Sequence, residues 1–111
     1  MASELSEAEA LRALGDPTRL HIVEYLAGRC CAPADDMGLQ AATAGEVCCH
    51  VSGEVKINST ISHHLHELEE AGLIRMNRDG RRVLCSANRP ALKELADYLA
   101  KLAEGDYDAC C

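Results

Sequence analysis

Residues 59–85 read STISHHLHELEEAGLIRMNRDGRRVLC, a stretch in which a helical pattern is followed at once by a hairpin pattern. Ile61, Leu65 and Leu68 step by four and three residues, which is the spacing of one buried helical face. The opposite face carries Ser, Thr, His and Glu side chains. The pattern predicts a helix from Asn58 to Ala71 that Gly72 ends, because glycine commonly terminates helices.

After Gly72 the period changes from that of a helix to that of a strand. Apolar and polar residues alternate on both sides of a tight Asp79-Gly80 turn, which predicts a β-hairpin with one buried face made of Ile74, Met76, Val83 and Cys85. Cys85 in such an alternation is more often a small buried hydrophobe than a ligand. The hairpin also carries a strip of four arginines against a single acid, Arg75, Arg78, Arg81 and Arg82 with Asp79.

Two helices are predicted at the start of the chain and one at its end. The first carries Leu5, Ala8, Leu11 and Leu14 on one face, and the second opens at Asp16-Pro17 and buries Leu20, Val23 and Leu26. The last begins at Asn88 and Pro90. Its leucines form a seam narrow enough for a helix–helix interface between subunits, and the seam consists of Leu92, Leu95, Leu99 and Leu102.

A short third helix is predicted at Thr43-Ala44-Gly45-Glu46, which fits a capping box. It would carry Cys48, Cys49 and His50 on its first turns. Residues 28–42 are rich in Gly, Pro and Asp without a period and are expected to form a loop insertion, and residues 105–111 a flexible tail. With 111 residues the chain is expected to be a single domain, residues 1–111.

Charge and composition exclude several classes of protein. The net charge of −7 weakens nonspecific binding to nucleic acid, but the arginine strip supplies the local positive charge that phosphate contact requires. No segment has the pattern of a leader or the ~18 apolar residues of a bilayer span, so a cytoplasmic location and no membrane partner are expected. His64 and His66 lack a nucleophile elbow and an acidic orienting residue, so an enzyme is not expected.

Two short helices followed by a basic β-hairpin predict a winged helix-turn-helix, mainly α with about five helices, whose second helix of the pair enters the major groove. Three segments, residues 13–28, 59–74 and 78–88, closely resemble the ArsR-type (arsenic repressor/metallothionein repressor) winged-helix family of metal-sensing transcriptional repressors. The resemblance implies a homodimer joined through the first and last helices, including Leu5, on double-stranded operator DNA. By position it also implies a base-reading set of Ser59, Thr60, Ser62, His63 and His64, and a phosphate-binding set of Arg78, Arg81 and Arg82.

The seven cysteines of the chain indicate what kind of signal such a regulator would sense. Six form vicinal pairs, Cys30-Cys31, Cys48-Cys49 and Cys110-Cys111, and a reducing compartment disfavours disulfides between them. The chain has no C-x-x-C motif, which argues against a thioredoxin-like oxidoreductase. Soft thiolates select arsenite, antimonite, Cd, Pb, Hg or Cu(I) over Mg or Ca, and zinc is also possible. All six paired cysteines are therefore candidate ligands.

The resemblance favours arsenite or antimonite as the effector, with Cd, Pb or Zn as alternatives. Family members of the arsenic type often carry E-L-C-x-C at the third helix, and GEVCCH departs from this pattern because His50 stands where the second thiol would be. Zinc and nickel sensors of the family use a last-helix site of Asp and His, and that helix here has no His. Cys30-Cys31 or Cys110-Cys111 are expected to supply the missing thiolates of a three-thiolate site.

Two other hypotheses remain open at this point. Vicinal thiols near a helix N-terminus oxidise readily, so the chain could be a thiol-redox or persulfide-responsive repressor. Alternatively, a cysteine-rich metal-buffering protein without DNA binding would explain the acidic total, although the polar helix face and the basic hairpin argue against it.

Overall fold

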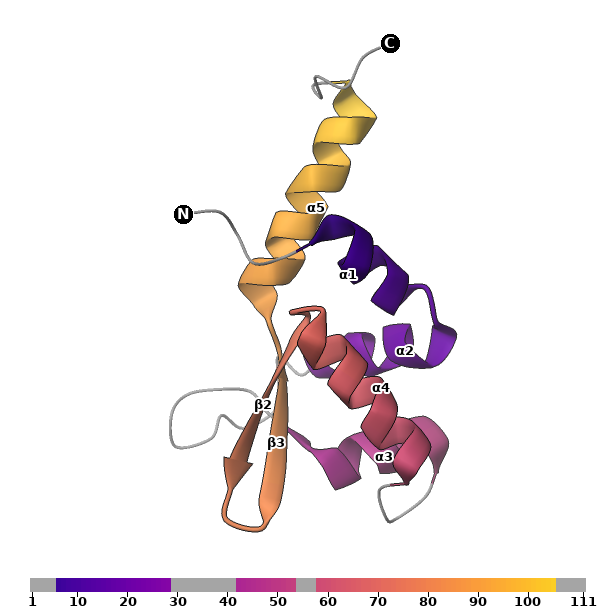
Figure 1. The fold of residues 1–111 in the computed structure, drawn as a ribbon, viewed down its shortest axis with the longest axis vertical. Coiled ribbons are helices and arrows are strands. Elements are labelled where there is room, and N and C mark those ends of the chain that lie inside the picture. The colour runs from indigo at the N-terminus through magenta and orange to yellow at the C-terminus, as the bar shows by residue number, and fades with distance from the viewer. Residues whose placement is uncertain (1–5, 29–41, 54–57, 106–111) are drawn as a thin grey trace.

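The computed structural model describes residues 6–28, 42–53 and 58–105. These residues form a mainly α fold with a β-hairpin, in the order α1 (Glu7–Leu14), α2 (Pro17–Ala27), β1 (Ala42–Thr43), α3 (Ala44–Ser52), α4 (Ser59–Glu70), β2 (Ile74–Asp79), β3 (Arg82–Ala87) and α5 (Arg89–Glu104). The winged helix-turn-helix with five helices is therefore confirmed. Figure 1 shows α3 and α4 together at one end of the molecule, with the β2–β3 hairpin beside them and α5 extending in the opposite direction.

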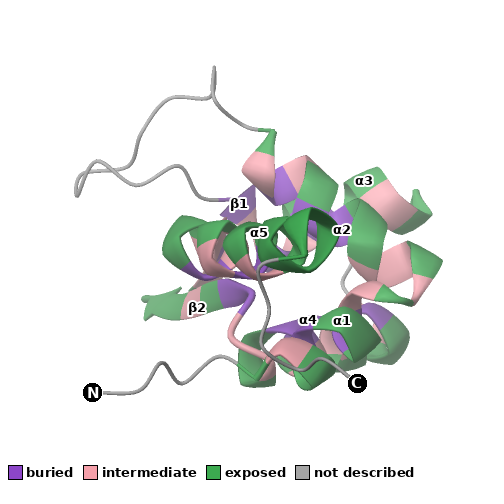
Figure 2. Ribbon diagram, turned by 90° about the horizontal axis from the view of Figure 1, so that it is seen from above, coloured by how far each residue is buried: buried purple, intermediate pink, exposed green. Residues whose placement is uncertain are grey.

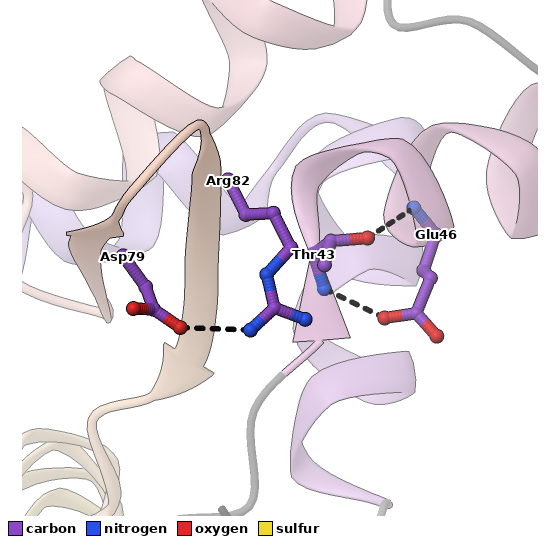
Figure 3. A network of polar contacts seen from close by, with 4 residues as sticks. All are labelled: Thr43, Glu46, Asp79 and Arg82. Atoms are coloured by element: carbon purple, nitrogen blue, oxygen red, sulfur yellow. Dashed lines mark hydrogen bonds and ion pairs between the residues drawn. The ribbon is translucent and has the colours of Figure 1, made fainter.

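Polar side chains begin the helices where the sequence predicted. The Asp16 carboxylate accepts hydrogen bonds from the backbone N–H groups of Thr18 and Arg19, at 2.8 and 3.2 Å. At α3 the full capping box forms, because Thr43 Oγ1 accepts from the Glu46 N–H and Glu46 Oε1 accepts from the Thr43 N–H (Figure 3). Each bond satisfies a backbone donor that has no partner within its own helix.

Two caps made by asparagine fix the starts of α4 and α5. Asn58 Oδ1 accepts from the Ile61 N–H at 2.8 Å and so starts α4. Asn88 begins α5 in the same way, and its side-chain amide also donates to the Gly72 carbonyl at 2.8 Å. Gly72 has a φ of +84°, which is a left-handed conformation that favours glycine. The turn after α4 is thus tied directly to the start of α5.

The three strands form one antiparallel sheet in the order β1-β3-β2. Cys85 is the central residue, paired with Met76 of β2 on one side and Ala42 of β1 on the other. The hairpin turn lies at Gly80-Arg81, since Asp79 and Arg82 are still paired, so the prediction of Asp79-Gly80 was one residue early. The short β1 was not predicted, because two residues carry no periodic signal. Apart from Gly28 and Ala42, the predicted 28–42 loop lies outside the described residues.

The core lies between α1, α2, α3, α4, the sheet and the inner part of α5, and Figure 2 shows buried faces of these elements turned inward. The predicted faces of α4 and of the hairpin are confirmed, because Ile61, Leu65, Leu68, Ile74 and Cys85 are all buried. Cys85 is a buried hydrophobic residue of the sheet, as expected.

The predicted faces of α1 and α2 were wrong in part. In α1 the buried residues are Ala10 and Ala13, whereas Leu11 is 41% exposed. In α2 Leu20 was predicted to be buried but is exposed, and Ile22 is buried in the core instead. The small side chains of Ala10 and Ala13 allow α1 to lie close to α2 and α4. The prediction rested on leucines spaced by three residues, and that spacing does not show which face the neighbouring helices contact.

The outer half of α5 projects beyond the rest of the described chain (Figure 1). Leu95 is 4% exposed because it packs in the core, and Leu92 is half-buried against it. Leu99 and Leu102 are 43% and 45% exposed. The leucine seam therefore divides into an inner part that holds α5 on its own chain and an outer part that has no covering residues among those described.

Candidate nucleic-acid interface

The polar side of α4 is built by the same spacing that buries its apolar side. Ser59, Thr60 and His63 are exposed, and Ser62 is half-buried. Hydroxyl and imidazole groups on the first two turns of a helix can bond both phosphates and base edges. Four of the five predicted base-reading residues are thus accessible on one end of α4.

His64, the fifth predicted base-reading residue, has a different environment. Arg19 of α2 donates a hydrogen bond from Nε to His64 Nδ1 at 3.0 Å, and both side chains are half-buried. An imidazole nitrogen that accepts this bond carries no proton, so the other nitrogen carries the N–H. His64 therefore joins α4 to α2, and the structure places it in a helix–helix contact as well as near the polar face.

Asp16 completes this contact electrostatically. Hydrogen bonds from the backbone N–H groups of Arg19 and Thr18 lower the pKa of the Asp16 carboxyl, the charge of Arg19 adds a smaller contribution, and desolvation acts in the opposite direction. The cap of α2 thus lies next to the residues that hold α4. Sequence reasoning missed the role of Arg19, because its partner is 45 residues away and no local spacing links them.

The hairpin forms a basic wing whose four arginines, Arg75, Arg78, Arg81 and Arg82, are all exposed. Arg82 donates to Asp79 Oδ2 at 2.7 Å across the base of the turn (Figure 3). Arg75, Arg78 and Arg81 make no ion pair with any residue of the described part of the chain. Two of the three predicted phosphate-binding arginines are therefore available without breaking a contact, whereas Arg82 would have to exchange Asp79 for phosphate.

The two cysteines of α3 differ sharply in their environments. Cys48 is fully buried, and its Sγ lies 3.4 Å from Ser52 Oγ, which in turn donates to the Cys48 carbonyl at 2.7 Å. Cys49 is exposed. Both lie in the second turn of α3, within the first turns that were predicted for them. Adjacent residues of a helix point about 100° apart, so one thiol faces the core and the other faces outward.

The other predicted ligands, Cys30, Cys31, Cys110 and Cys111, lie outside the described residues, as does Leu5 of the predicted dimer interface. Within residues 6–28, 42–53 and 58–105, no three His, Cys, Asp or Glu side chains are grouped to hold a metal ion. Cys85 is not a candidate, because burial raises the pKa of its thiol to about 11, with a smaller contribution from the charge of Glu69. Cys48 and Cys49 alone do not make a three-thiolate site.

Comparisons with known proteins identify this arrangement. Residues 14–77 match the family described as "Helix-turn-helix domain". An "uncharacterized HTH-type transcriptional regulator" of Methanocaldococcus jannaschii is 36% identical over 75 residues, which cover 66% of this chain and 67% of the relative. The chain belongs to this family of helix-turn-helix transcriptional regulators.

Solved structures of ArsR regulators share the fold. An ArsR-like transcriptional regulator from Rhodococcus sp. RHA1 superposes with a TM-score of 0.67 at 26% identity, covering 90% of this chain and 82% of that one. Another ArsR family transcriptional regulator gives a TM-score of 0.68 at 23% identity, covering 89% and 94%. The chain is therefore an ArsR-type winged-helix regulator, as predicted. The prediction that it is a DNA-binding regulator and not an enzyme is also confirmed. None of its described helices is both long and apolar enough to cross a membrane.

Proposed function

We propose that this ArsR-type regulator is a homodimeric repressor that places α4 in the major groove of its operator and releases the DNA when thiolates bind arsenite. The observation that carries the proposal is the division of α4, with Ile61, Leu65 and Leu68 buried and Ser59, Thr60 and His63 exposed beside a basic wing. A buried face that fixes the helix and a polar face of small side chains are what groove recognition requires.

The dimer is proposed from the apolar side chains that α1 and α5 leave exposed. Leu11 of α1 and Leu99 and Leu102 of α5 are each more than two-fifths exposed. The two helices contact each other within the chain (Figure 1). Pairing these helices with those of a second copy would cover the leucines and set two α4 helices about one DNA turn, ~34 Å, apart.

Arsenite is proposed as the effector because the chain offers soft thiolates and an accessible one on the helix that precedes α4. Cys49 is the exposed thiol of α3, so it is the first of the two that an ion can reach. The further thiolates would come from the pairs at 30–31 and 110–111. Antimonite is expected to bind in the same way, and Cd, Pb or Zn are the alternatives.

Cys48 supplies a physical route from the ion to the DNA. Its thiol is fully buried against the core and bonded to Ser52, so it can join the ligand set only if this turn of α3 opens. α3 contacts α2 and the sheet, and α2 in turn is bonded to α4 through Arg19 and His64. An ion that binds the opened form more tightly would lower operator affinity, and a coupling of about 1–3 kcal/mol is enough.

The test is fluorescence anisotropy of the reduced protein on a duplex from its own upstream region, titrated with arsenite and, in parallel, with cadmium and zinc. Cys49→Ser should bind the duplex like the wild type and require more arsenite for release. Cys85→Ala, which removes a buried thiol of the sheet, is the matched control and should be released like the wild type. Arsenite-dependent release that is unchanged in Cys49→Ser would refute the α3 site.

The same experiment separates the other candidates. Tight binding that no ion disturbs but peroxide reverses would favour a thiol-redox repressor, since Cys49 is an exposed thiol. Failure to bind any duplex would favour a metal-buffering protein.

A further inference from the structure

Outside the proposed thiolate site, two histidines of different helices lie against each other. His21 of α2 and His50 of α3 have ring centroids 5.0 Å apart with an angle of 66° between the ring planes. Both side chains are exposed. Nothing in the DNA-binding surface or in the proposed arsenite site uses this pair.

Tyr25 holds one of the two rings in place. It lies one turn after His21 on α2, and its ring stacks on that of His50 with centroids 4.1 Å apart and planes only 21° from parallel. Stacking covers a face of the imidazole and leaves its edges uncovered by Tyr25. The nitrogen lone pairs lie in the ring plane, so the stack orients His50 without using its donor atoms.

The spacing of the two rings fits a shared metal ion. Zinc binds imidazole nitrogen at about 2.0–2.1 Å in tetrahedral geometry, which places the centres of two bound rings ~5 Å apart. Binding of one ion by both rings requires a nitrogen of each to face the same point, and in the edge-to-face arrangement the His21 ring would have to rotate for this. That torsion has a broad energy profile, and His21 is exposed.

We propose that His21 and His50 form a two-imidazole site for a divalent late transition-metal ion such as Zn²⁺, with water in the remaining coordination positions. Imidazole is a preferred ligand of zinc, nickel and copper. Glu24 lies one turn after His21 and Glu46 one turn before His50, so each helix carries an exposed acid near its histidine, and Glu46 also accepts the Thr43 N–H of the capping box. These exposed acids attract a cation, although no third ligand completes the group among the described residues.

An ion in this site would join α2 to α3. These helices already contact each other, and α2 is bonded to α4 through Arg19 and His64. The bound ion would thus stiffen the support of α4. The site shares no ligand with the proposed thiolate site, although His50 directly follows Cys49 in α3, and it does not depend on the proposed response to arsenite.

The test uses full-length protein in which the five cysteines other than the two buried ones are replaced by serine, so that thiolates do not compete for the ion. Zn²⁺ is titrated while the Cε1–H resonances of the five histidines are followed by NMR. The resonances of His21 and His50 should move together on one binding curve, and those of His63 and His66 should not move. His21→Ala should weaken Zn²⁺ binding by about tenfold or more, and His66→Ala, a matched exposed histidine, should leave it unchanged.

Two further variants separate ligation from packing. His50→Phe preserves a ring that can stack on Tyr25 but removes the nitrogens, so it should fold normally and lose the Zn²⁺ response of His21. If the cysteine-to-serine protein does not fold, the same resonances are followed in the reduced wild type with Zn²⁺ added beyond saturation of the thiols. Separate binding curves for the two histidines, or an affinity that His21→Ala does not change, would overturn the proposal. Because operator binding is not measured here, failure of the repressor model would leave the result intact.

Discussion

The contact between Arg19 and His64 should contribute measurably to the stability of the fold, and a double-mutant cycle can isolate it. Arg19 Nε donates to His64 Nδ1 at 3.0 Å, and it joins α2 to α4. A hydrogen bond from a charged donor contributes about 1.5–3 kcal/mol net. Both side chains are only half-buried, so solvent screening reduces the expected coupling to about 1 kcal/mol.

The cycle consists of the wild type, Arg19→Ala, His64→Ala and the double variant, each unfolded in urea at the same protein concentration. Concentration is fixed because the proposed dimer would add to the apparent stability. The two single changes should together destabilise by about 1 kcal/mol more than the double change. Near the midpoint of thermal unfolding, 1 kcal/mol corresponds to a shift of about 4 °C for a chain of this size.

A matched cycle controls for unspecific effects of the substitutions. His66 lies on the same helix, is exposed, and its nearest ionic partner is Glu69 at 3.9 Å. Arg19→Ala combined with His66→Ala should therefore give additive losses. A coupling between Arg19 and His64 that is no larger than that between Arg19 and His66 would refute the inference that this bond holds α4 to α2.

Three further predictions concern the caps and the thiols. Thr43→Ala should destabilise the protein by about 1 kcal/mol in urea unfolding, because it removes one half of the capping box of α3. The lowered pKa of Asp16 means that its stabilising contribution is complete above its unfolded value of 3.8 and is lost as the pH falls through its folded value; Asp16→Asn should therefore flatten the pH dependence of unfolding in that acid range. Among the described cysteines of the native chain, Cys49 should react with iodoacetamide fast, and Cys48 and Cys85 only at the rate of opening, as read by mass spectrometry.

Much of the fold could be predicted because its strongest signals are local. The four-and-three spacing of apolar residues in α4, the alternation in the hairpin, and the caps at Asp16, Thr43 and Asn88 all fall within a few residues of sequence, and all are confirmed. Asn58 was predicted as the first residue of α4 and is its cap instead. The buried face of α1 was missed for a different reason. Alanine is compatible with either side of a helix, so the position of Ala10 and Ala13 depends on the neighbouring helices and not on the period of α1 itself.

The candidate site was predictable only as a set of residue types. The sequence placed Ser59, Thr60 and the wing arginines on accessible surfaces, and the structure agrees. It could not show that Arg82 is paired with Asp79 or that His64 is bonded to Arg19, because these contacts depend on the turn geometry and on the packing of α2 against α4. Cys48 and Cys49 were predicted together, yet one is in the core and the other at the surface.

The two cysteines of α3 have opposite roles, since one packs in the core and the other faces outward. The buried Cys48 side keeps the helix packed on the core, and its Sγ contacts Ser52 in the next turn. The exposed Cys49 side is where a thiophilic ion would first bind. If the ion also requires Cys48, the free energy of ion binding must exceed the free energy lost when Cys48 leaves the core. Opening this turn of α3 would then disturb its contact with α2, which is bonded to α4 through Arg19 and His64. Two adjacent thiols, one in the core and one at the surface, cannot both bind the same ion unless α3 moves. This requirement would couple ion binding to a change in the helix, as the proposed sensor needs.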